Sequence, residues 1–197
     1  MTELLPEKRI TLIHRVIVPD ADYPKEYAIL VTDRRSIFIR QLETRSSFVL
    51  RGEMKWGTAL VTDAVPKTLQ DYEETSLQSL SGEPVNIAVP HESVVSLAMK
   101  GDKPTFRARE FFVRWTMKMQ KEIFQVYNFE MTYLGGQKER GLVQFYAVPL
   151  GAYFKPRRQT QTRETILREY AEEVLEVYRG VLPAGVITAQ FIDDQSK

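Results

Sequence analysis

The first part of the chain alternates between apolar and polar residues, as half-buried strands do. Residues 9–19 carry an apolar side chain at almost every second position, and such alternation with many β-branched residues predicts a strand. Two further apolar runs, 27–32 and 35–42, are separated only by Asp33 and Arg34. This spacing predicts a hairpin with a two-residue turn, and a slightly longer connection stays open because glycine suits such turns better.

The pattern then weakens and breaks. Further short strands are expected at 48–50 and 58–62, but residues 63–84 are polar and acidic. A structureless loop of this length is unusual inside a compact domain. We therefore interpret 63–84 as a polar insertion that contains a short amphipathic helix. The apolar residues of this helix would be Leu69, Tyr72 and Leu80.

Strand patterns resume after the insertion. Residues 85–99 continue as an extended segment in which Pro90 marks a bend or an edge. Residues 110–120, 122–134 and 142–150 follow with short connections. Three consecutive strands of this kind predict an antiparallel meander.

Near the C-terminus the apolar period changes from two to that of a helix. From 162 to 179 the apolar residues recur three and four positions apart, which is typical of an amphipathic helix. Thr162 can cap the first turn. Gly180 stands where a left-handed residue would end the helix, and Pro183 prevents its continuation. A short strand can follow within 185–197.

These elements predict a mainly β (α+β) protein, with one domain spanning 1–197. A sheet with one apolar face must close on itself or be covered. We therefore expect an antiparallel curved sheet or partly open barrel, capped by the C-terminal helix at 162–180.

Two short motifs resemble pleckstrin-homology-like and GRAM-like domains of the bacterial PH type. In those families a strand runs into a T-D/N-x-R turn, which Thr32, Asp33 and Arg35 match. A later I-P-x-x-x-I-x-x-I segment is matched approximately by Val89, Pro90, Val94 and Leu97. The resemblance implies a PH-like fold with an insertion, in which the meander and the helix form the second sheet and its cap. It also implies a platform that binds proteins or lipid headgroups rather than an enzyme.

Composition narrows the function. The 197 residues include 27 Lys and Arg against 26 Asp and Glu, a net charge of +1, whereas general nucleic-acid binders carry a clear basic excess. The absence of cysteine excludes disulfides and thiolate metal sites. No run approaches the roughly 20 apolar residues of a membrane-spanning helix, and the first residues lack a signal-peptide pattern. We expect a cytoplasmic protein without specific nucleic-acid binding.

Catalytic motifs are sparse. The two histidines, His14 and His91, do not have metal-ligand spacing. We expect His14 in the core with a hydrogen bond, and His91 in a turn beside Glu92 and Ser93, where adjacency in sequence is not triad geometry. Residues 134–141 lack the Gly-Lys-Ser/Thr of a phosphate-binding loop and predict a hairpin tip. We expect no enzyme, no cofactor and no metal.

The clustered basic residues remain as candidates for ligand binding. In pleckstrin-homology domains a K-x(n)-R/K-x-R pattern near the first hairpin holds lipid phosphates; Lys103, Arg107 and Arg109 have this spacing but follow a later strand. The candidates are Arg34, Arg35, Arg107, Arg109, Lys138, Arg140, Lys155, Arg157 and Arg158. Two alternatives stay open: such arginines can simply keep a surface soluble, and Arg35 can pack its stem across the sheet.

The leading hypothesis is a non-catalytic binding module for a protein partner or for a second copy of the chain. Both faces of 124–133 are rather apolar, and an exposed apolar sheet face marks a protein-binding surface. The alternative is a β-barrel that binds a small molecule or anionic lipid. The bulky apolar side chains of 110–120 favour a filled barrel over a carrier.

Overall fold

The structure is a computed structural model that describes residues 6–19, 25–40, 68–73, 75–102, 126–136, 139–147 and 163–191. The strands expected at 48–50, 58–62 and 110–120 lie outside these residues.

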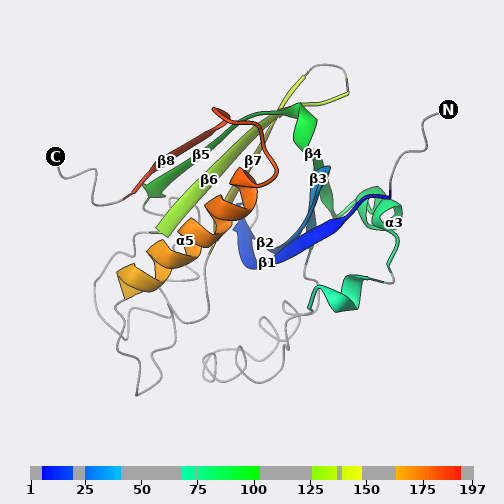
Figure 1. Ribbon diagram of the computed structural model, residues 1–197, viewed down its shortest axis with the longest axis horizontal. Coiled ribbons are helices and arrows are strands. Elements are labelled where there is room, and N and C mark those ends of the chain that lie inside the picture. The colour runs from blue at the N-terminus through cyan, green and yellow to red at the C-terminus, as the bar shows by residue number, and fades with distance from the viewer. Residues whose placement is uncertain are drawn as a thin grey trace.

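The described residues contain one curved sheet that is not closed (Figure 1). Its strands are β1 (Arg9–Val18), β2 (Lys25–Thr32), β3 (Arg35–Arg40), β4 (Ile87–Pro90), β5 (Val94–Asp102), β6 (Val126–Leu134), β7 (Arg140–Ala147) and β8 (Ile187–Gln190). They lie in the order β4-β3-β2-β1-β7-β6-β5-β8. Neighbouring strands are antiparallel except β5 and β8, which are parallel. The mainly β fold class with a curved sheet and a helix cap is confirmed, and β8 makes the sheet mixed.

The predicted meander is wrong in its first strand. The neighbours of β6 are β7 and β5, so β5 occupies the place that was expected for residues 110–120. The reason lies at Pro90, where β4 ends and the 3-10 turn η3 (His91–Ser93) leads into β5. Because of this corner, the apolar segment forms two strands in different parts of the sheet. β4 pairs with β3, and β5 pairs with β6.

A narrow connection divides the sheet into two halves. β1 pairs with β7 only at Val16 with Ala147 and at Ile17 with Tyr146. We call β1–β4 the first half-sheet and β5–β8 the second half-sheet. Aromatic side chains from both halves meet between them: the ring of Phe145 lies 5.4 Å from that of Phe38, edge to face, and stacks 4.9 Å from Phe129.

The helix α5 (Arg163–Arg179) covers the inner face of the second half-sheet. Its periodic apolar residues belong to the main core, as the sequence predicts. The fully or nearly fully buried members are Leu167, Ala171, Val174, Leu175 and Tyr178. Tyr170 also donates a hydrogen bond over 2.6 Å to the carbonyl oxygen of His14 on β1, so α5 is fixed to both half-sheets.

The predicted role of Gly180 is wrong. The positive backbone angle belongs to Gly185, with φ at 89°. After α5 the chain reaches a turn at residues 183–186, which is closed by a hydrogen bond from Val186 N to the carbonyl oxygen of Pro183 over 3.3 Å. Gly185 is the third residue of this turn, a position at which a type II turn requires positive φ. The left-handed residue therefore turns the chain into β8 rather than ending α5.

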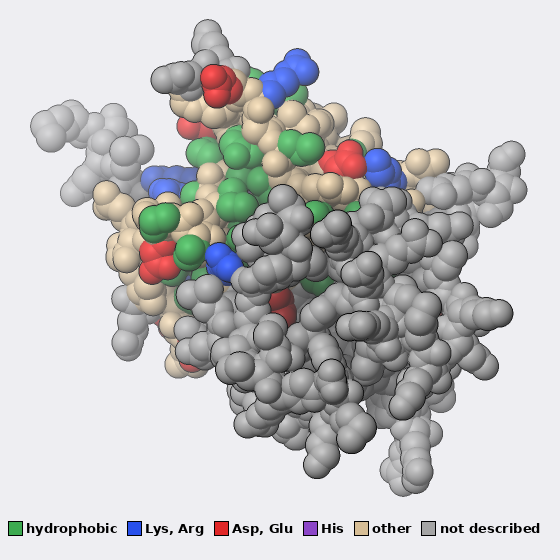
Figure 2. All heavy atoms as spheres, turned by 180° about the vertical axis from the view of Figure 1, so that it is seen from behind, with side chains coloured by type: hydrophobic (Ala, Val, Ile, Leu, Met, Phe, Trp, Pro, Cys, Tyr) green, Lys and Arg blue, Asp and Glu red, His purple; other side chains and the backbone are tan. Residues whose placement is uncertain are grey.

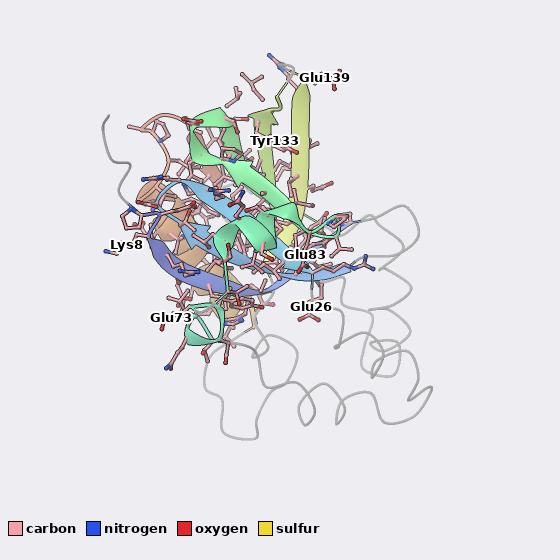
Figure 3. All side chains as sticks on the ribbon, turned by 90° about the vertical axis from the view of Figure 1, so that its right-hand side faces the viewer. Lys8, Glu26, Glu73, Glu83, Tyr133 and Glu139 are labelled. Carbon is pink, nitrogen blue, oxygen red and sulfur yellow. The ribbon has the colours of Figure 1, made fainter. Side chains whose placement is uncertain are left out.

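Part of the polar insertion folds back onto the first half-sheet. It forms the 3-10 turn η2 (Gln70–Tyr72) and the helix α3 (Leu77–Gly82), and α3 lies over the outer face of β2 and β3 (Figure 3). A second, smaller core lies there. Its buried members are Leu30, Ile37, Ile39, Tyr72 and Leu80. The helix expected around Leu69, Tyr72 and Leu80 is thus present, in two short pieces.

We predict that Leu80→Ala lowers the free energy of unfolding by about 2–3 kcal/mol, because a buried leucine is replaced by a cavity. Urea denaturation measures this change. Gln78→Ala, at an exposed position of the same helix, is the control and should change stability by less than about 0.5 kcal/mol. Equal effects of the two substitutions would show that the insertion does not stabilise the sheet.

Candidate functional site

The turn between β2 and β3 is closed by the hydroxyl group of Thr32. Thr32 Oγ1 accepts hydrogen bonds from the backbone N–H groups of Arg34 and Arg35 over 3.1 and 2.9 Å. It also donates to Oε1 of Glu7 over 2.6 Å. The predicted two-residue turn of Asp33 and Arg34 is confirmed, and the Thr32 side chain stabilises it by accepting two backbone hydrogen bonds.

Arg35 forms a bidentate ion pair with Glu7. Its Nε donates to Glu7 Oε1 over 2.9 Å and its Nη2 to Oε2 over 2.6 Å, while Nη1 lies 3.3 Å from the hydroxyl of Ser81 on α3. Beside this pair, Lys8 N donates to the Asp33 carboxylate oxygen Oδ1 over 2.9 Å, and Asp33 N donates to the carbonyl oxygen of Lys8 over 2.9 Å. Among the described residues, these structural partners account for the polar contacts of the Arg35 guanidinium.

A buried hydrogen bond lies behind this ion pair. Ser36 Oγ and His91 Nε2 are 3.0 Å apart, and His91 N donates to the carbonyl oxygen of Arg34 over 2.7 Å. The fully buried Tyr178 of α5 lies near this hydrogen bond, and its own hydroxyl group has no hydrogen-bond partner among the described residues. We call Glu7, Arg35, Ser36, His91 and Tyr178 the polar junction, because it joins the first half-sheet, the η3 corner and α5.

Burial determines the protonation states in the polar junction. It lowers the pKa of His91, and the nearby charges of Glu7 and Asp33 oppose this shift. Burial also raises the pKa of Tyr178, an effect that the nearby polar Ser36 side chain opposes. Both rings are therefore neutral near pH 7.

The distance between Ser36 and His91 is that of a nucleophile and its general base, but their burial argues for a structural role. Ser36 is 0% exposed and His91 is 4% exposed, so no substrate reaches the hydroxyl group. The hydrogen-bond partner of His91 comes from β3 and is not the adjacent Ser93. Among the described residues, no cluster of three His, Cys, Asp or Glu side chains could hold a metal ion.

The basic candidates fall into three groups. Arg35 belongs to the polar junction. Arg34 is exposed on the β2–β3 turn and Arg140 is exposed at the start of β7, so these two lie on different half-sheets. The others, Arg107, Arg109, Lys138, Lys155, Arg157 and Arg158, lie outside the described residues.

The connection between β6 and β7 is the hairpin tip that the sequence predicts. Gly135 N donates to the carbonyl oxygen of Glu139 over 2.8 Å, and Tyr133 and Glu139 mark this end of the molecule in Figure 3. The ring of Tyr133 packs against Gly141 so closely that a Cβ atom there would lie 2.3 Å from it. This contact fixes which side chains of the hairpin face inward.

The opposite side of this hairpin carries exposed apolar residues. Leu142 is 62% exposed, Val95 46% and Leu134 43%. Arg140 pairs with Leu134 and Leu142 with Thr132, so these side chains share one face, and Val95 lies at the start of the neighbouring strand β5, between the pairs of Val94 with Tyr133 and Ser96 with Thr132. Figure 2 shows apolar side chains gathered on this side, with charged side chains of both signs beside them. We call Val95, Leu134, Arg140 and Leu142 the hairpin face.

The structure limits the expectation that both faces of 124–133 are rather apolar. Among the described residues, the positions of β6 that alternate with Tyr127, Phe129 and Met131 are Val126, which is apolar and buried, and then Asn128, Glu130 and Thr132, which are polar. The exposed apolar surface instead lies at the hairpin end, where Leu134 and Leu142 interrupt the polar phase. In a strand that alternates between apolar and polar residues, an apolar residue at a position where a polar one is expected is the sequence signal that could have identified this face.

No protein-family model matches the chain, and no curated protein sequence matches it significantly. A solved structure with a detectable likeness is the hSac2 domain from human phosphoinositide phosphatase Sac2. The sequences are 11% identical, the TM-score is 0.44, and the match covers 96% of this chain and 82% of that one. A likeness at this level carries no argument about function. No helix in the described residues is long and apolar enough to cross a membrane.

We predict that acidification destabilises the protein through His91. The folded state binds the proton less readily than the unfolded chain, whose histidine has the ordinary pKa of 6.5. Stability from this group is complete above that value and falls as the pH drops below it, by up to about 1.4 kcal/mol for each unit of pKa difference. Denaturant unfolding of the wild type and of His91→Asn between pH 7 and 5 measures the effect. Identical pH profiles would contradict it.

We also predict that Gly141→Ala lowers the free energy of unfolding by about 1–3 kcal/mol, because the added methyl group displaces the ring of Tyr133. Gly136→Ala is the matched control, since no atom lies within 4 Å of the added Cβ there. Thermal denaturation distinguishes the two variants. A Gly141→Ala protein as stable as Gly136→Ala would show that Tyr133 does not hold the hairpin in register.

Proposed function

We propose that the protein is a non-catalytic binding module that engages a protein through the hairpin face. The observation that carries this proposal is the clustering of exposed apolar side chains. Of the five large exposed apolar residues among the described ones, Leu134 and Leu142 lie on the hairpin, and Val95 lies at the start of β5 beside the end of β6. Scattered apolar side chains are ordinary on a protein surface, whereas a cluster marks an interaction site.

The contrast between the two half-sheets supports this assignment. The outer face of the first half-sheet is covered by α3 and η2 of the same chain. At the hairpin end of the second half-sheet, Leu134 and Leu142 remain exposed. Removing apolar surface from water lowers the free energy of the system. A protein partner would therefore cover this face, as the insertion covers the outer face of the first half-sheet.

The size of the face indicates the strength of binding. Full burial of a leucine or valine contributes about 1.5–3 kcal/mol, and each of the three apolar residues is only about half exposed. Association costs at least about 4 kcal/mol in lost freedom. Apolar burial alone therefore supports a weak interaction, to which the exposed Arg140 would add a charged contact.

The resemblance to pleckstrin-homology-like and GRAM-like domains supports a binding role. The C-terminal helix α5 covers the second half-sheet, in the capping position that this resemblance gives to the helix. The T-D-x-R turn also has a structural explanation, since Thr32 closes it and Arg35 pairs with Glu7.

The interior argues against the small-molecule carrier. Phe38, Phe129 and Phe145 are fully buried between the half-sheets and their rings are in contact. A carrier requires small or polar inward residues around its ligand.

An anionic lipid surface is a second candidate. Exposed leucines beside Arg140 at a hairpin tip have the chemistry of a segment that inserts apolar residues among acidic headgroups. The same variants that test protein binding also test this alternative.

We predict that Leu142→Asp abolishes capture of a specific protein from extracts of the native cell, because the charge would have to be buried at the interface. Affinity capture followed by mass spectrometry compares this variant with the wild type. Ile10→Asp is the matched control, since Ile10 is an exposed apolar residue on β1 in the first half-sheet, and it should capture the same protein as the wild type.

Equal capture by all three proteins would contradict the role of the hairpin face. Sedimentation with vesicles rich in phosphatidylserine tests the lipid alternative. If the wild type binds these vesicles and Leu142→Asp does not, while no protein is captured, the lipid surface replaces the protein partner as the function of this face.

A further inference from the structure

We infer that the partner of the hairpin face is a second copy of this chain, related by a two-fold axis that passes over Leu142. This inference rests on the proposed binding function and names its partner. It is carried by two charged groups of opposite sign on the outer side of the same hairpin, Arg140 and Glu130.

Arg140 is an exposed cation without a partner in the described structure. It lies opposite Leu134 on the neighbouring strand, and none of the described residues forms an ion pair with its guanidinium group. An arginine held beside two exposed leucines is a favourable contact for a carboxylate of an incoming protein.

Glu130 is the complementary anion. Its Oε1 accepts hydrogen bonds from Lys100 Nζ and Asn128 Nδ2, both over 3.0 Å. Within the described residues Oε2 forms no hydrogen bond or ion pair. The side chain of Glu130 is 33% exposed, so this oxygen atom remains available to an arginine from outside.

The positions of these two charges permit reciprocal pairing. Glu130 lies opposite Gln144, and the pair of Thr132 and Leu142 lies between that row and the row of Arg140. Strands lie about 4.8 Å apart and two residues span about 6.8 Å. Consider a two-fold axis that lies parallel to the sheet and passes over the pair of Thr132 and Leu142. Rotation about this axis places Arg140 of one copy over Glu130 of the other, and Glu130 over Arg140.

Such an axis gives a plausible sheet packing. With the spacings above, the strands of the two copies would run antiparallel at roughly 40°, near the usual angle for two sheets packed face to face. Each Arg140 would meet the Glu130 of the other copy, and the two Leu142 side chains would meet beside the axis. A two-fold interface of this kind uses the same patch twice.

The mixed charge favours a protein copy over an anionic membrane. Glu130 shares the face with Arg140, and Glu139 lies at the hairpin tip (Figure 3). Carboxylates of this kind are repelled by acidic headgroups, whereas they complement Arg140 of a second copy.

Analytical ultracentrifugation of the full-length protein across a wide range of concentrations tests the inference. We expect the wild type to dimerise weakly and reversibly, and Arg140→Glu to weaken the dimer at least about tenfold, because it places two carboxylates together. Glu130→Arg should have a similar effect, and the double variant Arg140→Glu with Glu130→Arg should recover most of the lost affinity. Arg179→Glu, an exposed charge reversal on α5, should leave the dimer unchanged.

Recovery in the double variant supports the predicted pairing directly, since it requires the two residues to meet. A wild type that stays monomeric at the highest concentration, or a double variant no better than either single one, overturns the inference. Circular dichroism establishes that each variant is folded; if Glu130→Arg is not, because Lys100 loses its partner, the comparison of Arg140→Glu with Arg179→Glu decides.

The results separate this inference from the proposed function. A monomeric wild type whose capture of another protein depends on Leu142 would exclude the homodimer and retain the binding module. A dimer that Leu142→Asp leaves intact would exclude this inference, because association would then use a different surface, and the capture experiment would still decide the proposed function.

Discussion

The ion pair between Arg35 and Glu7 determines how the first half of the molecule is held together. The side chain of Glu7 is only 9% exposed, and a carboxylate that is so far removed from water is stable only when charged and hydrogen-bonded partners surround it. Arg35 supplies a bidentate contact and Thr32 a further hydrogen bond. Since Arg35 also reaches Ser81, one guanidinium group connects the N-terminal segment, the hairpin and the insertion.

This arrangement explains why the two half-sheets offer different surfaces. The first half-sheet uses its own insertion to cover its outer face, and the polar junction holds that insertion in place. The second half-sheet is joined to it by two residue pairs between β1 and β7, so the β6–β7 hairpin extends away from the junction (Figure 1). At the other edge, Phe191 fixes β8 by contacting the ring of Tyr127 at 5.8 Å and the guanidinium of Arg168 at 4.7 Å.

Much of this fold could be predicted from periodicity, because strands and helices are local patterns. The strand at 9–19, the hairpin around Asp33 and Arg34, and the C-terminal helix were all predicted and are present. The pairing of strands was not local. The corner at Pro90 divides one apolar segment into β4, which pairs with β3, and β5, which pairs with β6. The spacing of apolar residues does not show which strands pair.

The candidate site was harder to predict because residue type does not reveal environment. Arg35 and Arg140 were equivalent as clustered basic residues, yet one pairs with a carboxylate 28 residues away in the sequence and the other is exposed beside two leucines. The distinguishing property is the phase of each residue within its strand. Leu134 and Leu142 alternate along their strands with the core-facing residues, at positions where polar side chains also lie. A one-residue shift in register would bury the leucines, but it would also move the polar residues of the same strand into the core, so the register keeps the leucines exposed. An apolar residue in that phase is exposed by the register itself, so the search for a binding surface in such a sheet begins with apolar residues out of phase rather than with clusters of arginine.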